Sequence, residues 1–326
     1  MELLIRKVNE YTIGDRVDSY LIIKRVDLKT TNQAGRKYLD FILGDATGAI
    51  VAKMWEVPQD MEGFYEPNMA VRVRGTVTNF NNQPQFKVDR IRLITEEDQV
   101  DPSSLVITAP LDPDYMYGEI LTRYIETLEN LDMKLIVERL FRENEEKLLY
   151  YPAAKRNHHA IRSGLLYHVL TMLRLSDAIL TVYPNLNRDL IVSGIILHDM
   201  SKLEEMDSTD LGIVREYTVP GSLLGHITLG VQNIGRAGRE MGASEEVVML
   251  LQHMVLSHHY EPEYGSPVKP MFPEAEMLHF IDLIDSRMYD MKNIQDKLEP
   301  GTLSDFIPVL DRRKVYKPDL DQDEII

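Results

Sequence analysis

The 326-residue sequence contains no cysteine. This absence excludes disulfide bonds, thiolate nucleophiles and cysteine-ligated zinc, so any metal ion must bind to histidine, aspartate or glutamate. Long apolar runs are also missing, because none approaches the roughly 20 residues that cross a bilayer. The N-terminal MELLIRKVNEY lacks the apolar core and the small-residue cleavage site of a signal peptide. Together these features predict a cytoplasmic protein without a membrane span.

Positive charge is scarce and unevenly distributed. The net charge of −16 at first argues against a nucleic-acid partner, because phosphate contacts need lysine and arginine. Residues 1–100 carry 14 basic against 15 acidic side chains, whereas the remainder carries 22 against 37. Any nucleic acid is therefore expected on the first part of the chain, while the acidic remainder suits the binding of cations.

The first hundred residues have the pattern of a small β-barrel. β-Branched and aromatic residues gather in five segments separated by turn-prone residues, at 16–26, 36–43, 49–55, 70–80 and 85–94. A helix-like piece at 58–65 stands between the third and the fourth segment. Five strands with a helical piece at this point is the order of an OB-fold, whereas a β-sandwich would need about seven strands.

Two proline-containing segments, 101–104 and 109–113, mark a boundary, because proline lacks an amide donor and disfavours helix in the residue before it. From Tyr115 onward apolar residues recur at spacings of three and four, and no strong strand signal follows. The predicted organisation is an OB-fold domain at 1–100, a linker with connecting helices at 101–150, an all-α domain at 151–300 and a C-terminal extension at 301–326.

All nine histidines lie between 158 and 279. The dipeptide His198-Asp199 ends an apolar helical run, 190–197, where an imidazole and a carboxylate are costly to bury unless something pairs with them. By itself, a His-Asp dipeptide often occurs by chance and does not indicate a functional site. Further residues of metal-binding type stand on neighbouring predicted helices beside apolar stripes: His168, His226, His258, His259 and Asp282. This set predicts a site for a divalent metal.

The order His168…His198-Asp199…Asp282 matches the H…HD…D signature of the HD-domain phosphohydrolases. The sequence also resembles the YhaM-type 3′→5′ exoribonucleases, which carry an OB-fold in front of the HD domain. The resemblance covers residues 14–95 and 150–290, and its most specific segments are NHHAIRSGLLYHVL, LIVSGIILHDMSK, GSLLGHI, LSHHYEPEYGSPV and EAEMLHFIDLID. Two positions depart from the family pattern: Ser201 and Tyr260 both stand where the family usually has glycine.

The resemblance implies a metal-ligand set of His168, His198, Asp199 and Asp282. The ion is expected to be manganese, with iron, cobalt and nickel as alternatives that the same ligands suit. Three more histidines are similar to those that hold a second ion or contact the scissile phosphate in some HD proteins: His226, His258 and His259. One of the adjacent pair is expected only to support the other, because neighbours on a helix point about 100° apart.

Other side chains near the motif are candidates for contacts with phosphate. Lys202 follows His198 by four residues and is expected to neutralise a phosphate oxygen, so that Asp199, Lys202 and His226 form the catalytic group. His159 and Arg162 are candidates for the product phosphate, with a surface role as the alternative. Asp285 is expected to orient a metal ligand. The two remaining histidines of this region, His253 and His279, are expected to be structural.

The expected reaction is metal-assisted hydrolysis of a phosphodiester. The resemblance implies a single-stranded RNA substrate, or single-stranded DNA, shortened from its 3′ end to nucleoside 5′-monophosphates. In the OB-fold domain, aromatic stacking and basic side chains are expected to hold the strand. The aromatic candidates are Tyr38, Phe41, Trp55, Phe80 and Phe86, and the basic ones are Lys37, Lys53, Arg72, Arg74 and Lys87. Alternation along a strand puts Tyr38 and Phe41 on opposite faces, so at most one of them stacks on a base.

Two other functions remain open at this point. One is an HD phosphohydrolase of small nucleotides or cyclic dinucleotides with an accessory OB-fold. The other is a non-catalytic RNA-binding adaptor with a degenerate HD domain, against which the complete ligand set argues. A homo-oligomer also stays open, because helical domains of this kind often leave apolar faces that pair.

Overall fold

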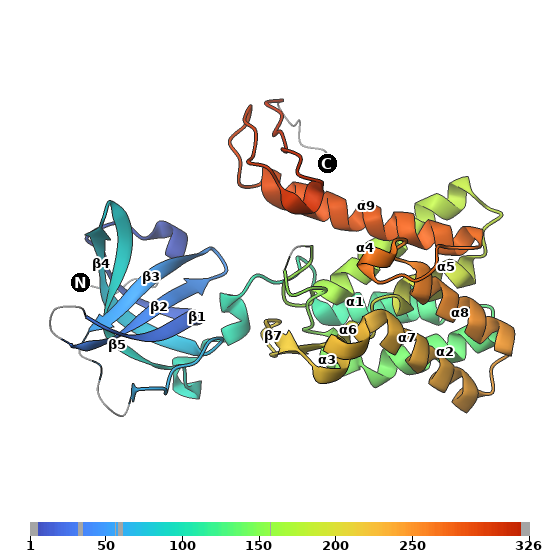
Figure 1. The fold of residues 1–326 in the computed structure, drawn as a ribbon, viewed down its shortest axis with the longest axis horizontal. Helices are drawn as coiled ribbons and strands as arrows, with labels where there is room; N and C mark the ends of the chain where they lie inside the picture. Colours follow the sequence, from blue (N-terminus) through green and yellow to red (C-terminus); the bar gives the residue numbers. More distant parts are fainter. Residues whose placement is uncertain (1–5, 32–34, 56, 58–60, 157, 321–326) are drawn as a thin grey trace. The chain divides into compact units, whose positions relative to one another are not determined.

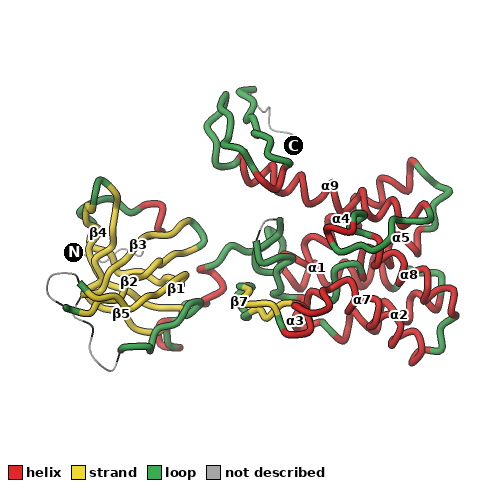
Figure 2. Tube along the Cα trace, in the orientation of Figure 1, coloured by secondary structure: helices red, strands yellow, loops and turns green. Residues whose placement is uncertain are grey.

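The computed structural model describes residues 6–31, 35–55, 57, 61–156 and 158–320. The chain divides into two compact units, Met1–Thr108 and Ala109–Ile326. Strands make up most of the first unit and helices most of the second (Figures 1 and 2). The expected order, a β-barrel domain followed by a helical domain, is therefore confirmed.

The first unit is a closed barrel with the strand order β1-β2-β3-β5-β4. Its strands are β1 (Arg16–Thr30), β2 (Lys37–Asp45), β3 (Gly48–Trp55), β4 (Ala70–Phe80) and β5 (Gln83–Leu93), and its short 3₁₀ turns are η1 (Val8–Glu10), η3 (Glu96–Asp98) and η4 (Pro102–Leu105). Of the helical piece expected at 58–65, residues 58–60 lie outside the described residues, residue 61 is 3₁₀-helical and 62–64 form a turn.

Strand β1 closes the barrel because it pairs with two neighbours. Its first half pairs with β4 and its second half with β2, and a bulge between Ile23 and Arg25 lies where the partner changes. Alternate side chains point inward, and Phe41 of β2 and Phe86 of β5 are fully buried in the core that results. A two-residue turn, Asn81-Asn82, joins β4 to β5 with both residues in the left-handed region, as hairpins with the right-handed twist of strands require.

The second unit is a helical bundle. Its elements are α1 (Pro113–Glu119), the π-helical turn η5 (Ile120–Ile125), α2 (Leu131–Glu143), α3 (Glu145–Leu148), α4 (Gly164–Val182), α5 (Arg188–Leu197), α6 (Lys202–Glu205), β6 (Met206–Ser208), β7 (Val214–Tyr217), α7 (Val219–Met241), α8 (Glu245–Ser257), η6 (Pro262–Tyr264), α9 (Pro273–Gln295) and η7 (Pro308–Leu310). Helices α1 and α2, expected as part of a linker region, contribute Met116 and Phe141 to the same core as α4, α5, α8 and α9.

Helix α5 is the central element of this bundle. The Asn187 side chain accepts a hydrogen bond from the Leu190 amide and so caps the N-terminus of the helix. Every residue from Asp189 to Leu197 is buried. Gly194 lets α8 approach closely, because a Cβ atom there would lie 2.4 Å from Met254 Cε. This buried helix ends at Leu197 and delivers His198-Asp199 into the interior of the unit.

The expectation of an all-α second half is wrong for one short segment. Strands β6 and β7 pair as an antiparallel hairpin between α6 and α7. Two strands of three and four residues are too short to show a repeated alternation, and the sheet is held by its packing against the helical core, to which the buried Met206 belongs.

Helix α4 is long and apolar enough, by length and composition, to cross a membrane, contrary to the expectation from the sequence. Within the second unit, however, it is a core helix. Leu165, Leu166, Leu170 and Leu173 are all buried against neighbouring helices, and the same helix carries the buried His168.

Candidate metal centre and nucleic-acid face

Five helices bring the expected ligands to one point in the second unit. Histidines and aspartates come from α4, from the C-terminal ends of α5 and α8, from α7 and from α9: His168, His198, Asp199, His226, His258, His259 and Asp282. The structure therefore brings together every residue that the sequence proposed as a metal ligand.

The carboxylate of Asp199 lies at the centre of this cluster and is buried. Its Oδ2 atom lies 3.3 Å from His198 Nε2 and 3.8 Å from His168 Nε2. Its Oδ1 atom lies 3.4 Å from His226 Nε2 and 3.8 Å from His258 Nε2. The two oxygens thus face two different groups of histidines.

The five histidines share one orientation. In each ring Nδ1 is hydrogen-bonded to an oxygen: His168 to Asp285 (2.7 Å), His198 to the Ile195 carbonyl (2.7 Å), His226 to Glu205 (3.1 Å), His258 to the Val255 carbonyl (2.7 Å) and His259 to the Tyr264 carbonyl (2.6 Å). A carbonyl or carboxylate oxygen can only accept, so Nδ1 carries the proton and donates it. Each ring is therefore held with its Nε2 atom turned toward the centre, the arrangement found in histidines that bind metals.

The atoms that face the centre lack partners of their own. Four buried Nε2 atoms, those of His168, His198, His226 and His258, have no hydrogen-bond partner within the described part of the chain, and neither does Asp199 Oδ1. Leaving a single buried polar atom unpaired costs about 1–3 kcal/mol. Burial also holds the pKa of His258 well below its ordinary value, which keeps that ring neutral. A cluster of buried, unpaired imidazole and carboxylate atoms fits a divalent cation.

These atoms form two subsites that share Asp199. His168, His198 and Asp282 offer one group of ligand atoms, and Asp199, His226, His258 and His259 offer the other, with the atoms in each group within 4.8 Å of one another. Asp199 Oδ2 faces the first group, so the same carboxylate spans both subsites. Imidazole and carboxylate ligands of this kind would suit a divalent metal.

Asp285 of α9 holds the His168 ring in place. Its Oδ2 atom accepts hydrogen bonds from His168 Nδ1 and from His159 Nε2, each 2.7 Å long. Burial alone would lower the pKa of His168, but the carboxylates of Asp282 and Asp285 outweigh it and raise the pKa to about 10. Histidines that bind metals are usually oriented by a carboxylate in this way.

Asp285→Asn is expected to raise the manganese concentration needed for half-maximal activity by about 10–100-fold, because the amide holds the His168 ring less firmly. At saturating manganese the kcat is expected to recover, which a purely structural defect would not allow. Asp290→Asn is the matched control, since Asp290 lies on the same helix with no hydrogen bond or ion pair to the described residues. Equal manganese dependence in the two variants would contradict the role given to Asp285.

Glu205 plays the corresponding role for His226, and the sequence did not predict it. Its Oε1 atom accepts hydrogen bonds from the backbone amide (3.0 Å) and from Nδ1 (3.1 Å) of His226. Gly225 makes this approach possible, because its φ of 70° and ψ of 161° break the helical path of α7 just before His226. The available signal was a glutamate three residues after Lys202, at the end of the HD motif.

Lys202 faces the centre as expected. Its buried ammonium group lies 2.7 Å from Asp199 Oδ2, and the attraction of that carboxylate outweighs burial and raises the pKa of Lys202. Ser201, beside it, has a φ of −77°, so no glycine is required at this position. The Ser201 hydroxyl accepts a hydrogen bond from Asn233 at 3.0 Å, which satisfies the polar group that the substitution introduces.

Tyr260 is the more strained of the two departures from the family pattern. Its φ of 68° lies in the left-handed region, where a residue with a side chain costs roughly 1–2 kcal/mol relative to glycine. The ring packs against His279 with centroids 4.8 Å apart, and Lys269 Nζ lies 4.5 Å from its centroid. These contacts offset part of the strain beside the His258-His259 pair.

His159, the candidate for a contact with the product phosphate, is buried in the helical unit. His159 is only 1% exposed, because its ring stacks on Tyr289 and its Nε2 is bonded to Asp285. Both rings lie beside His168: the ring centroid of His158 is 6.2 Å and that of His159 5.2 Å from the His168 centroid. Burial, together with the positive charge of Lys202, lowers the pKa of His158 to about 4 and keeps it neutral.

The structure places the remaining candidates away from the ligand atoms. Arg162 donates a hydrogen bond to the Asp210 carbonyl at 3.1 Å, beside the β6–β7 hairpin. His253 Nε2 accepts a hydrogen bond from the Met271 amide. His279 Nδ1 donates to the His258 carbonyl, which helps to hold the end of α8. None of these three belongs to the metal-type groups among the described residues.

On the OB-fold unit, three aromatic rings gather on the outer face around one lysine. Tyr38 and Trp55 face each other across β2 and β3, with ring centroids 4.7 Å apart. Lys53 Nζ lies 5.2–5.6 Å from the ring centroids of Tyr38, Trp55 and Phe80. Trp55 is 41% exposed and Phe80 is 53% exposed. Exposed rings beside a cation are the usual platform for single-stranded nucleic acid.

Other expected members of this face lie elsewhere. Phe86 is wrong as a stacking residue, because it is fully buried in the barrel, as is Phe41. Alternation along β5 turns Phe86 inward. Lys37 forms an ion pair with Glu62 at 2.7 Å, and Arg72 pairs with Asp18 at 2.9 Å. Both basic groups are therefore partly neutralised within the protein.

Trp55→Ala is expected to weaken binding of single-stranded RNA by about 1–3 kcal/mol, roughly 5- to 150-fold, with little effect on folding. Phe86→Ala is the contrasting variant and is expected to destabilise the barrel by about 3–5 kcal/mol. RNA affinity measured by fluorescence anisotropy, and unfolding followed by calorimetry, separate the two effects. If Trp55→Ala binds RNA with unchanged affinity, the aromatic face is not part of the RNA-binding surface.

Comparison with known proteins agrees with both halves of the structure. Residues 21–94 match the family described as OB-fold nucleic acid binding domain, and residues 165–287 match the HD domain family. The fold and the site together define an HD-domain, metal-dependent phosphohydrolase with an N-terminal OB-fold. The 3′-5′ exoribonuclease YhaM of Geobacillus sp. (strain WCH70) is 41% identical over 315 residues, which cover 97% of this chain and 96% of that protein. The chain belongs to the YhaM family.

Two of the solved structures that resemble part of this chain are described as OB-fold or OB domains. The second OB-fold domain of replication protein A from Methanococcus maripaludis is 20% identical, covers 28% of this chain and 95% of that chain, and has a TM-score of 0.24. The OB domain of Ta0387 from Thermoplasma acidophilum is 17% identical, covers 28% of this chain and 87% of that chain, and also has a TM-score of 0.24.

Proposed function

We propose that this protein is a metal-dependent exoribonuclease that shortens single-stranded RNA from its 3′ end and releases nucleoside 5′-monophosphates. The observation that carries the proposal is the buried carboxylate of Asp199 between two groups of histidines whose Nε2 atoms face it. The direction and the RNA substrate are those in the name of the relative, 3′-5′ exoribonuclease YhaM, which supports this part of the proposal.

In this proposal two groups of residues would hold divalent cations. His168, His198, Asp282 and Asp199 would hold one divalent cation, and Asp199, His226, His258 and His259 a second. When bound, such a cation activates water for attack and withdraws charge from the phosphoryl oxygens. Manganese suits this mixture of imidazole and carboxylate ligands.

Side chains around the ligands would position the substrate. Lys202 presents a buried ammonium group beside Asp199, where it would pair with a phosphate oxygen and hold the scissile group in place. His158, kept neutral by burial, would donate or accept a hydrogen bond at the same edge of the site. Asp285 and Glu205 hold the imidazole rings of His168 and His226, so the donor atoms need not rearrange when ligands bind.

The OB-fold unit would bind the strand through Tyr38, Trp55 and Phe80, with Lys53 as the nearby cation. We keep residues 1–100 as the nucleic-acid-binding part, 151–300 as the hydrolytic part and 301–326 as an extension. Of the expected linker, 101–150, helices α1 and α2 pack into the core of the helical unit. We place the enzyme in the cytoplasm, where the lack of cysteine brings no disadvantage. Self-association also stays a prediction, and the exposed Phe280, Ile284 and Met288 of α9 are its candidate contact residues.

Hydrolysis of a short 5′-labelled single-stranded RNA tests the proposal. With manganese we expect a ladder that shortens from the 3′ end, and with EDTA an intact substrate. A circular RNA of the same sequence is the matched control, because an enzyme that needs a free end leaves it uncut, and the corresponding DNA measures the preference for RNA. An intact linear RNA under both conditions would contradict the proposal in favour of a small-nucleotide hydrolase or a non-catalytic adaptor.

A further inference from the structure

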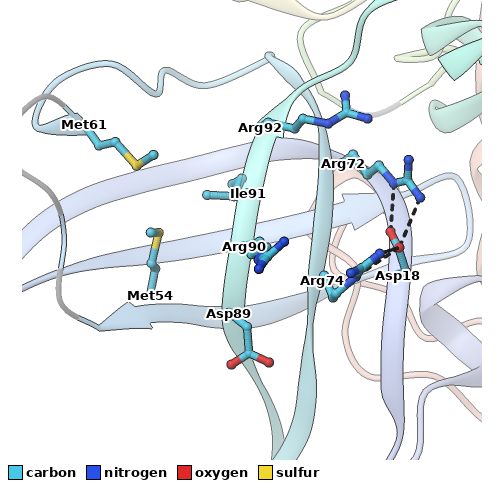
Figure 3. Close-up of a pocket in the computed structure, with 9 residues that line it drawn as sticks. All are labelled: Asp18, Met54, Met61, Arg72, Arg74, Asp89, Arg90, Ile91 and Arg92. Atoms are coloured by element: carbon cyan, nitrogen blue, oxygen red, sulfur yellow. Dashed lines mark hydrogen bonds and ion pairs between the residues drawn. The ribbon is translucent and has the colours of Figure 1, made fainter. Parts of the chain in front are cut away.

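An arginine-rich cavity of about 410 Å³ lies on the OB-fold unit, apart from the aromatic face (Figure 3). Its lining comes from β1, β3, β4, β5 and the connection between β3 and β4. A cavity of this size is within the usual range for small-ligand sites, about 300–1,000 Å³.

Four arginines face this cavity because β4 and β5 are paired with a bulge. Arg72 lies opposite Arg92, and Arg74 lies opposite Arg90. The next pair is Gly75 with Val88, so Asp89 is an extra residue in β5. Strict alternation after Lys87 would turn Arg90 toward the barrel interior. The bulge returns Arg90 and Arg92 to the outer side, beside the arginines of β4, and bulges often re-aim side chains near functional sites.

Two buried aspartates neutralise part of this charge. Asp18 forms paired hydrogen bonds with Arg72 (2.9 and 3.1 Å) and with Arg74 (2.7 and 3.2 Å). Asp98 does the same for Arg92, with two bonds of 2.6 Å. These contacts fix the planes and positions of three guanidinium groups, as a site for an anion requires.

Arg90 is left without such a partner. It is exposed and forms no ion pair or hydrogen bond with any residue that the structure describes. Figure 3 shows dashed lines from Arg72 and Arg74 to Asp18 and none at Arg90. Like charges directly across a strand pair are destabilising, so an anion bound beside Arg74 and Arg90 would stabilise that pair, although the carboxylate of Asp89 also lines the cavity.

The other side of the cavity is apolar. Met54, Met61 and Ile91 line it, and in Figure 3 they lie on the side of β5 away from Arg72 and Arg74. The cavity opens here because β3 pairs with β5 only at Ala52 and Lys53, which leaves a seam beyond them. Methionine thioethers make favourable contacts with flat aromatic rings. An anion site beside a methionine-lined surface suits a ligand that has a phosphate at one end and a nucleobase at the other.

We propose that this cavity binds one nucleotide, with its phosphate on Arg90 and the neighbouring arginines and its base against Met54 and Met61. The choice of ligand rests on the proposed function. Two sources share this chemistry: a nucleotide within the RNA strand, and a free nucleoside 5′-monophosphate such as the reaction releases. Lys87, the ladder neighbour of Lys53, is only three residues before Arg90, so the cavity lies about 10 Å along β5 from the aromatic face. A strand bound on that face can therefore continue into the cavity.

Binding by the full chain in EDTA tests the proposal, because no hydrolysis interferes. Labelled single-stranded RNA is titrated by anisotropy over a series of salt concentrations, and adenosine 5′-monophosphate is titrated by calorimetry. Arg90→Ala is compared with Arg16→Ala, which removes an equally exposed arginine of β1 that does not line the cavity. For a nucleotide within RNA, Arg90→Ala is expected to weaken binding on the order of fivefold to tenfold and to lower the salt slope by about 0.7.

For a free nucleotide, saturable binding of the monophosphate to the wild-type protein is expected to be lost in Arg90→Ala and kept in Arg16→Ala. Either result supports the cavity as a nucleotide site and shows whether the nucleotide belongs to an RNA strand or is a free monophosphate. The proposal is overturned if Arg90→Ala weakens the binding of RNA and of adenosine 5′-monophosphate no more than Arg16→Ala does. Manganese-dependent shortening of RNA is measured separately, so failure of the cavity and failure of the proposed function are distinguishable.

Discussion

Asp199→Asn is expected to reduce the kcat for RNA hydrolysis by at least about 10³-fold, since each tenfold corresponds to about 1.4 kcal/mol of transition-state stabilisation. The carboxylate spans both groups of histidines, so its loss weakens both subsites at once. Asparagine keeps the shape of the side chain, and its carbonyl oxygen can still accept a hydrogen bond from Lys202. The variant is therefore expected to fold and to bind RNA with unchanged affinity in EDTA.

The measurement is kcat at saturating manganese, with RNA affinity determined in parallel. Asp290→Asn is the matched control, because it removes one carboxylate charge from the same unit outside the metal-type groups. Activity of Asp199→Asn within tenfold of the wild-type value would show that the carboxylate is not central to hydrolysis. Loss of RNA binding together with activity would point instead to a folding defect.

Removal of divalent metal is expected to abolish hydrolysis and to lower the melting temperature of the helical unit by about 10 °C. Buried Nε2 atoms without partners repel one another when no cation lies between them. A cation present at 1,000 times its Kd stabilises the folded state by about 4 kcal/mol, and each kcal/mol corresponds to about 2–4 °C for a unit of this size. Added manganese is expected to restore both properties, with two ions bound per chain.

The two units can be followed separately in this experiment. The chain has a single tryptophan, Trp55, on the OB-fold unit, so tryptophan fluorescence follows the barrel while far-UV circular dichroism follows mainly the helices. His226→Ala is expected to bind one manganese ion fewer, and His253→Ala, which alters a histidine outside the metal-type groups, is expected to keep both. A melting temperature insensitive to EDTA and manganese would contradict a metal site within the helical core.

The comparison of sequence with structure is most informative at the adjacent histidines 158 and 159. The residue type was visible in the sequence, but the direction of the His159 ring was not, because it depends on the stacking of Tyr289 from α9. Tyr289 is 130 residues away along the chain. Contacts at such separation have no local signature, and this is why the sequence did not show that the His159 ring would be buried.

Phe80 and Phe86, which belong to one hairpin, also show that the sequence does not reveal the direction of a side chain. Both belong to strands rich in β-branched and aromatic residues, and both were predicted to contact nucleic acid. The closure of the barrel turns Phe86 into the core and leaves Phe80 exposed beside Lys53. An unpredicted bulge at Asp89 then reverses the alternation for Arg90 and Arg92. The face that a strand residue occupies is a property of register and closure, which one bulge is enough to change.

The sequence by itself determined the order of two domains, an OB-fold before a helical domain, and the residue types of the metal centre. Both are carried by local patterns: alternation and helical periodicity for the folds, and a histidine or aspartate beside the apolar stripe of each helix for the ligands. Only the tertiary structure decided that Asp199 spans two subsites, that Glu205 and Asp285 orient the rings, and that four arginines share one cavity. These arrangements depend on side chains brought together from distant parts of the chain, and their distances are set by packing rather than by any local spacing.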